Sequence, residues 1–211
     1  MKPRALLLCV LMILAMTAVT AWYYPALPEV MPTHWNYAGR VDGYGARWQL
    51  WIVGPVAMSA FLLLAIALPW LSPRQFEVQN SGATYSYLMV IPVALFAAIE
   101  LFMLCSALGL KLDVVRVIPA LVFVVLILMG NPMGKVRRNF FIGIRTPWTL
   151  ASEQVWYATH RLAGKLMVGS GVLGLIAAWL GAPHWLLLVL MMAWGPVAAG
   201  YSLVRYKNLP Q

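Results

Sequence analysis

The sequence predicts an all-α integral membrane protein with six transmembrane helices and with both termini in the cytoplasm. Its composition, its long uncharged runs and the placement of its basic residues predict this class. Of the 211 residues, 63% are hydrophobic and only 10% are charged, whereas a soluble domain is about 25% charged. We therefore expect residues 1–211 to form a single membrane domain.

Six apolar runs are candidates for the transmembrane helices, because each approaches or exceeds the roughly 20 residues that a helix needs to cross a bilayer. They cover residues 5–24, 50–71, 85–108, 114–130, 166–181 and 185–204. Gly-Pro pairs at positions 54–55 and 195–196 would kink the second and the sixth helix.

The distribution of Lys and Arg predicts the orientation, because cytoplasmic loops carry the excess of these residues. With the N-terminus inside, eleven of the fifteen basic residues, Arg74 among them, lie on the cytoplasmic side. Only Arg40, Arg47, Lys111 and Arg116 lie outside. The net charge of +9 is then explained by topology and by attraction to anionic membrane lipids, and it requires no direct binding of nucleic acid.

The longest basic passage, residues 130–165, reads GNPMGKVRRNFFIGIRTPWTLASEQVWYATHRLAGK. Two glycines and a proline end the fourth span, and Trp148 is placed to anchor the following segment at the membrane interface. Ser152 or Thr149 is a helix N-cap, with Glu153 in the first turn. The apolar spacing after it predicts an amphipathic helix that runs directly into the fifth span. We expect this loop and helix to lie on the cytoplasmic side.

Two interpretations of the basic passage stay open. It is either an interfacial anchor that follows the positive-inside rule, or a cup of Arg145, His160 and Arg161 that binds a lipid headgroup, a carboxylate or a partner peptide. Arg145 lies in an apolar turn, where a guanidinium needs a partner. The candidates are Glu153, a lipid phosphate or an acidic group on another protein.

The other polar segment is the extracytoplasmic loop, residues 25–49. Glu29, His34, Asn36 and Asp42 supply the nitrogen and oxygen atoms that a divalent metal binds. The alternative is a hydrogen-bonded loop folded over the mouth of the helix bundle, with no cofactor. The composition does not decide between them.

Glu100 is the one acidic residue well inside an expected span, and an intramembrane carboxylate is a candidate functional residue. It would pair with Arg116, pair with a polar residue of a facing helix, or remain protonated in a structural hydrogen bond.

Two motifs carry a family resemblance. "GNPMGKVRRNFFIGIRTPWTL" with "VWYATHRLAGK" resembles the signature of the SdpI family of bacterial membrane proteins, and "MPTHWNYAGRVDGYG" resembles a domain of unknown function that often precedes it. The resemblance falls on Asn131, Gly134, Asn139, Gly143, Arg145, Thr146, Pro147, Trp148, Thr149, Trp156, Thr159, His160 and Arg161, and on Pro32, His34, Asn36, Gly39, Asp42 and Gly43.

This resemblance implies a multi-pass protein of the bacterial cytoplasmic membrane that gives immunity to a secreted toxin peptide and signals to a cytoplasmic regulator. The candidate binding residues are Glu100, Asn139, Arg145, Trp148, Glu153, Trp156, His160 and Arg161, with a metal at Glu29, His34 and Asp42.

The alternative functions are a metal-dependent membrane hydrolase and a small transporter. The hydrolase would use His34 with Asp42, or Glu153 with His160. The sequence contains no H-E-x-x-H, G-x-S-x-G or P-loop motif, which favours a non-enzymatic protein.

Overall fold

The computed structural model describes residues 1–73 and 82–209, so Arg74 lies outside the described residues. The first half contains α1 (Pro3–Tyr23), the 3₁₀ turn η1 (Tyr24–Ala26), β1 (Val30–Trp35), β2 (Val41–Ala46), α2 (Gln49–Trp51), the π-helical turn η2 (Ile52–Val56), α3 (Ala57–Leu71) and α4 (Gly82–Ala107). The second half contains α5 (Val114–Met133), α6 (Pro147–Ala151), α7 (Glu153–Trp179), α8 (His184–Met192) and α9 (Trp194–Lys207).

The described residues contain six helical segments that are long and apolar enough to span a membrane, which confirms the predicted architecture. Two of these spans are composite. Gln49–Leu71 joins α2, η2 and α3, and His184–Lys207 joins α8 and α9. Pro55 lies within η2, where a missing backbone N–H is accommodated by the wider turn. The sixth span changes helix at Ala193, just before the second Gly-Pro pair.

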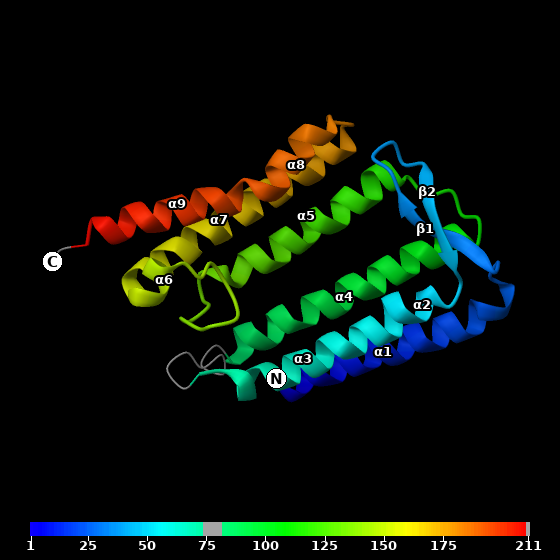
Figure 1. Ribbon diagram of the computed structural model, residues 1–211, viewed down its shortest axis with the longest axis horizontal. Coiled ribbons are helices and arrows are strands. Elements are labelled where there is room, and N and C mark those ends of the chain that lie inside the picture. Colours follow the sequence, from blue (N-terminus) through cyan, green and yellow to red (C-terminus); the bar gives the residue numbers. More distant parts are fainter. Residues whose placement is uncertain (74–81, 210–211) are drawn as a thin grey trace.

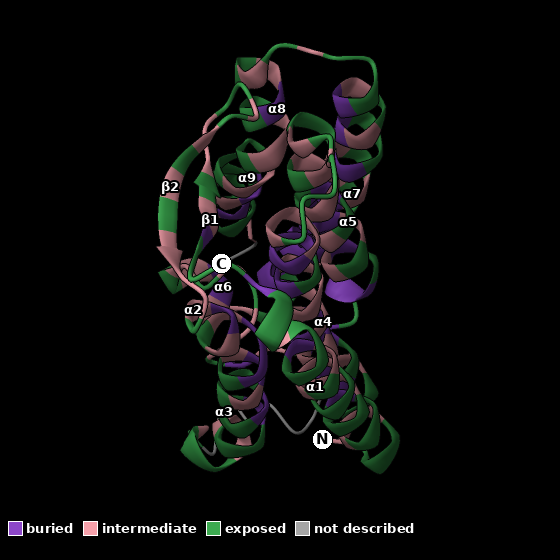
Figure 2. Cartoon of the chain, turned by 90° about the vertical axis from the view of Figure 1, so that its right-hand side faces the viewer, coloured by how far each residue is buried: buried purple, intermediate pink, exposed green. Residues whose placement is uncertain are grey.

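The spans lie side by side in two groups (Figure 1). One group contains α1, α3 and α4, and the other contains α5, α7, α8 and α9. The two groups meet where α4 passes α5. Buried positions face the interior of each group while exposed positions cover the outside (Figure 2), as expected for helices whose outer faces meet lipid.

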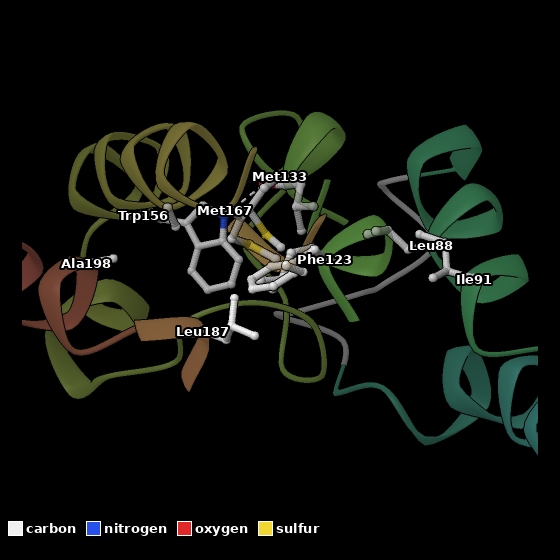
Figure 3. Close-up of a cluster of buried hydrophobic side chains, with 12 residues drawn as sticks. Leu88, Ile91, Phe123, Met133, Trp156, Met167, Leu187 and Ala198 are labelled. Carbon is white, nitrogen blue, oxygen red and sulfur yellow. Dashed lines mark hydrogen bonds between the residues drawn. The ribbon is translucent and has the colours of Figure 1, made fainter. Parts of the chain in front are cut away.

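The core of the second group is centred on Phe123 of α5, Trp156 and Met167 of α7, and Leu187 of α8, with Leu88 and Ile91 of α4 at its border (Figure 3). Glycines bring α5 and α7 into close contact. A Cβ on Gly164 would lie 2.6 Å from the carbonyl oxygen of Gly130, so any larger residue would push the helices apart.

The two ends of the bundle differ in structure (Figure 1). At one end β1 and β2 form an antiparallel hairpin, which the helical prediction did not include. At the other end lie α6 and the loop between α5 and α6. Both segments join successive spans.

Candidate functional site

The segment between α5 and α6, residues 135–146, is called the signature loop here. It contains almost no regular secondary structure, so its backbone groups need other partners. Asn139, only 1% exposed, supplies several of them. Its amide nitrogen donates to the carbonyls of Arg137 (2.9 Å) and Ile142 (3.1 Å), and its amide oxygen accepts from the N–H groups of Phe141 (2.8 Å) and Ile142 (2.7 Å). Asn139 therefore holds the loop in one conformation.

Two side chains from the first turns of α7, Trp156 and His160, bind the backbone of the signature loop. The ring of His160 stacks on that of Trp156 with centroids 4.0 Å apart, and both side chains are fully buried. The Trp156 indole donates to the carbonyl of Val136 (2.8 Å). The backbone N–H of Ile144 donates to Nε2 of His160 (3.0 Å), so the proton of the neutral ring is on Nδ1, which lies 2.8 Å from the Trp156 carbonyl. Both ring nitrogens of His160 are thus occupied.

Gly143 is required where the loop passes His160. Its φ of +113° lies in the region that favours glycine. A Cβ at this position would lie 2.1 Å from Nε2 of His160. The close approach allows the next residue, Ile144, to donate to the ring.

A second set of hydrogen bonds joins α6 to the loop and to the last helix. Thr146 and Thr149 form a capping box at the start of α6, and the Thr149 hydroxyl also donates to the carbonyl of Ile144 (2.8 Å). The Trp148 indole donates to the hydroxyl of Ser202 on α9. Trp148 therefore joins α6 to α9, in addition to its expected place near the membrane interface.

The outer surface of the signature loop is basic. Lys135, Arg137 and Arg145 of the loop are exposed, as is Arg161 of the neighbouring helix α7. Arg145 donates to the carbonyl of Phe140 (2.5 Å) and lies over the Phe140 ring, with its guanidinium carbon 6.0 Å from the centroid. One arginine donor is thereby committed, and the side chain remains exposed.

The structure corrects two expectations about this region. Glu153, one of the three candidate partners of Arg145, lies 3.7 Å from Arg138 instead. His160 was expected in the cup with Arg145 and Arg161, but it is buried beneath the loop. The cup is therefore reduced to Arg145 and Arg161, because the loop covers the helix face that carries His160.

The hairpin end brings together two of the three predicted metal ligands. Nδ1 of His34 lies 2.5 Å from a carboxylate oxygen of Asp42, and both side chains are well exposed. Asn36 accepts from the N–H groups of Ala38 (3.0 Å) and Arg40 (3.1 Å) and shapes the turn. Within the described part of the chain, no three His, Cys, Asp or Glu residues gather as a metal site would require. Glu29 thus does not complete a site with this pair.

Glu100 is fully buried where α4 meets α1 and η2. The hydroxyl of Thr20 donates to Oε1, while Oε2 has no hydrogen-bond partner among the described residues. Arg116 instead pairs with Asp113 (3.0 Å). A Cβ on Gly54 would lie 2.0 Å from the carboxylate, so the Gly-Pro pair also provides the space that Glu100 occupies.

Sequence reasoning missed Thr20 and Ser202, which complete the contacts of Glu100 and Trp148. Each is a small hydroxyl residue within an apolar span and, like Glu100, is fully buried. Such residues commonly satisfy their hydroxyl within their own helix. Their partners lie 80 and 54 positions away in the chain, so only the packing of the helices identifies them.

Comparison with known proteins places this geometry in context. Residues 135–202, which include the signature loop, match the SdpI/YfhL protein family, and residues 11–58, which include the hairpin, match DUF1648, a domain of unknown function. The chain is also 24% identical over 192 residues to the immunity protein SdpI of Bacillus subtilis (strain 168), an alignment that covers 91% of this chain and 89% of that protein. No solved structure shows significant similarity to the chain.

Proposed function

The chain is a member of the SdpI/YfhL family, and from that premise we propose that it protects a bacterial cell against a secreted, membrane-active toxin peptide. The observation that carries the proposal is the similarity to the B. subtilis immunity protein along nearly the whole of both chains. Because the alignment covers both ends of the bundle, the proposal concerns the whole protein.

The proposed orientation places the signature loop and both termini in the cytoplasm, and the hairpin outside. The positive-inside rule supports it, because the exposed cations of the signature loop lie at the opposite end from the hairpin. In the bacterial cytoplasmic membrane, a peptide arriving from outside then meets the hairpin end first.

The signature loop is the proposed cytoplasmic contact surface. Its conformation is held by buried hydrogen bonds of Asn139, Trp156 and His160, while Arg145 and Arg161 face outward. A rigid surface with projecting guanidinium groups suits the carboxylates of an acidic regulator or the phosphates of lipid. We therefore also propose that the loop passes a signal to a cytoplasmic partner.

The experiment compares a strain that lacks the gene with the same strain carrying the gene on a plasmid. Both are exposed to a panel of membrane-active antimicrobial peptides, and the minimal inhibitory concentration of each peptide is measured. We expect the deletion to lower this concentration for at least one peptide and the plasmid to restore it. Equal sensitivity of both strains to every peptide would contradict the proposal.

A further inference from the structure

A groove of about 510 Å³ lies between α5 and α7, near the end of the bundle that carries the signature loop. Its size falls within the roughly 300–1,000 Å³ of ligand sites. Four glycines and Val168 line it together with three polar residues, Asn131, Arg161 and Lys165. Arg145 of the signature loop is not part of its lining. We call this hollow the basic groove.

Glycines create the space in the basic groove. The two helices touch at Gly130 and Gly164, because a Cβ on Gly164 would lie 2.6 Å from the Gly130 carbonyl oxygen. An added Cβ on Gly169, in contrast, would meet no atom within 4 Å. The helices are therefore in contact along one part of the groove, while the part next to Gly169 is open.

Two cations line this space without a partner from the protein. Arg161 and Lys165 lie four residues apart on α7, on the same face of the helix, and both are exposed. The stem of Arg161 rests on α5, where a Cβ on Gly134 would lie 3.1 Å from its Cγ. Among the described residues, neither cationic side chain has a hydrogen bond or an ion pair. The stem is thus placed by packing, while the charged groups keep their donors for another molecule.

No acidic side chain in the described part of the chain offsets these two charges. The structure describes five acidic residues, Glu29, Asp42, Glu100, Asp113 and Glu153. The first two belong to the hairpin end, Glu100 is buried in the other helix group, and Asp113 pairs with Arg116. Glu153 lies at the start of α7, next to Arg138. The uncompensated positive charge of the groove favours an anionic ligand.

An apolar track continues from the cations along α7. Val168, Val172 and Ile176 recur every fourth residue and so lie on one face of the helix. Lys165 shares this face, because it lies three positions before Val168. Val172 and Ile176 are 44% and 53% exposed. The helix rises about 16 Å from Lys165 to Ile176, which is about half of the roughly 30 Å hydrocarbon core of a bilayer. The track therefore has the length of one membrane leaflet, with the cations at its polar end.

We propose that the basic groove binds an anionic membrane phospholipid, with its phosphate against Arg161 and Lys165 and an acyl chain along the apolar track. The phosphate oxygens accept from the guanidinium, the ammonium and the Asn131 amide, as in other basic pockets between membrane helices. A headgroup amine would add a third cation, so phosphatidylglycerol should bind in preference to phosphatidylethanolamine. An acidic peptide would meet the cations but leave its backbone groups without partners along the track.

Native mass spectrometry of the full-length protein in a neutral detergent tests the proposal. The two probes are dioctanoyl phosphatidylglycerol and dioctanoyl phosphatidylethanolamine, and the dissociation constant of each is measured. We expect the first lipid to bind about tenfold more tightly, because of the two basic residues. Glycerol 3-phosphate, which has the phosphate but no acyl chain, should not displace it at equal concentration.

A pair of charge variants locates the phosphate. Arg161→Gln with Lys165→Gln removes both charges from the groove. The control, Arg205→Gln with Lys207→Gln, removes the same two charges from exposed positions in the last turn of α9, outside the groove. The affinity for phosphatidylglycerol should fall about tenfold in the first variant and stay unchanged in the control.

A pair of glycine variants locates the lipid in the groove itself. Gly169→Leu places a side chain in the open part of the groove, where its Cβ overlaps no protein atom. Gly200→Leu is the control, because its Cβ also meets nothing within 4 Å but the residue lies on α9, outside the groove. Gly169→Leu should weaken phosphatidylglycerol binding about tenfold through overlap with the lipid, and Gly200→Leu should leave it unchanged.

The proposal is overturned if the two lipids bind equally or if either groove variant behaves like its control. Displacement of the lipid by glycerol 3-phosphate at equal concentration would identify a site for soluble phosphates and overturn it as well. The proposal goes beyond toxin immunity and does not rest on it, since binding is measured on purified protein without any toxin. A chain that protects cells against no peptide but still selects phosphatidylglycerol would keep the lipid site and lose the proposed function.

Discussion

The two ends of the bundle carry polar residues in opposite ways. At the signature-loop end, Asn139, Trp156 and His160 are buried and hydrogen-bonded. At the hairpin end, His34 and Asp42 pair with each other at an exposed site, beside a cavity of about 460 Å³. The comparison teaches that one end buries its polar side chains to hold a loop in place, while the other end leaves a histidine and a carboxylate at the surface beside a cavity. Each end contains a histidine, His160 or His34, so substituting each one tests the difference.

The largest effect is expected for His160→Ala. The substitution removes a stacked ring and leaves the Ile144 N–H without its acceptor, so the free energy of unfolding should fall by about 3 kcal/mol or more. Thermal and denaturant unfolding of the purified protein in detergent measure it. A change below about 1 kcal/mol would show that the signature loop is not held by this ring.

Gly143→Ala sharpens the comparison by testing the loop's closest approach. The added Cβ meets His160 in addition to the backbone strain at φ +113°. Gly181→Ala is the control, because Gly181 also has a positive φ (+74°) but nothing lies within 4 Å of the added Cβ. Gly181→Ala should cost about 1 kcal/mol from strain, and Gly143→Ala should cost at least about 1 kcal/mol more because the loop must shift. Equal losses of unfolding free energy would contradict the contact.

Arg145 tests whether the fixed surface is used in recognition. Arg145→Ala and Arg145→Lys should each change the free energy of unfolding by about 1 kcal/mol or less, because the side chain is exposed. Both should reduce protection in cells at matched protein levels, because lysine keeps the charge but loses the planar donor array. Full protection by both variants would show that residues 130–165 act only as a membrane anchor.

The smallest effect is expected for His34→Ala. The pairing of His34 with Asp42 is exposed, so removing it should change the free energy of unfolding by about 0.5 kcal/mol or less. This change is much smaller than the decrease expected for His160→Ala. Metal content of the purified wild type, His34→Ala and Glu29→Ala, measured by mass spectrometry, tests the predicted metal. Because Glu29 does not join His34 and Asp42, we expect Glu29→Ala to leave the metal content unchanged. A loss of metal in Glu29→Ala would show that Glu29, His34 and Asp42 form a three-ligand site.

The sequence alone predicted well those structural features that depend on residues close together in the chain. The apolar runs gave the six spans, and the spacing after Ser152 gave an amphipathic helix continuous with the fifth span, with Ser152 as its N-cap. These features are determined by run length and by local hydrogen bonds, which are read directly from neighbouring residues. The family resemblance also belongs here, because its signature is a long, gapless run of neighbouring residues, and the family models match residues 135–202 and 11–58.

Only the tertiary structure decided which polar side chains stay available. The sequence offered His160 as a member of the cup with Arg145 and Arg161, but the signature loop folds back over the His160 ring and buries it. The partners of Trp148 and Glu100 come from distant spans, and the cavity of about 460 Å³ at the hairpin end forms only where the hairpin meets α4 and α5. A sequence pattern specifies the faces of a helix, whereas burial depends on what packs against each face, and that follows from the arrangement of the whole bundle.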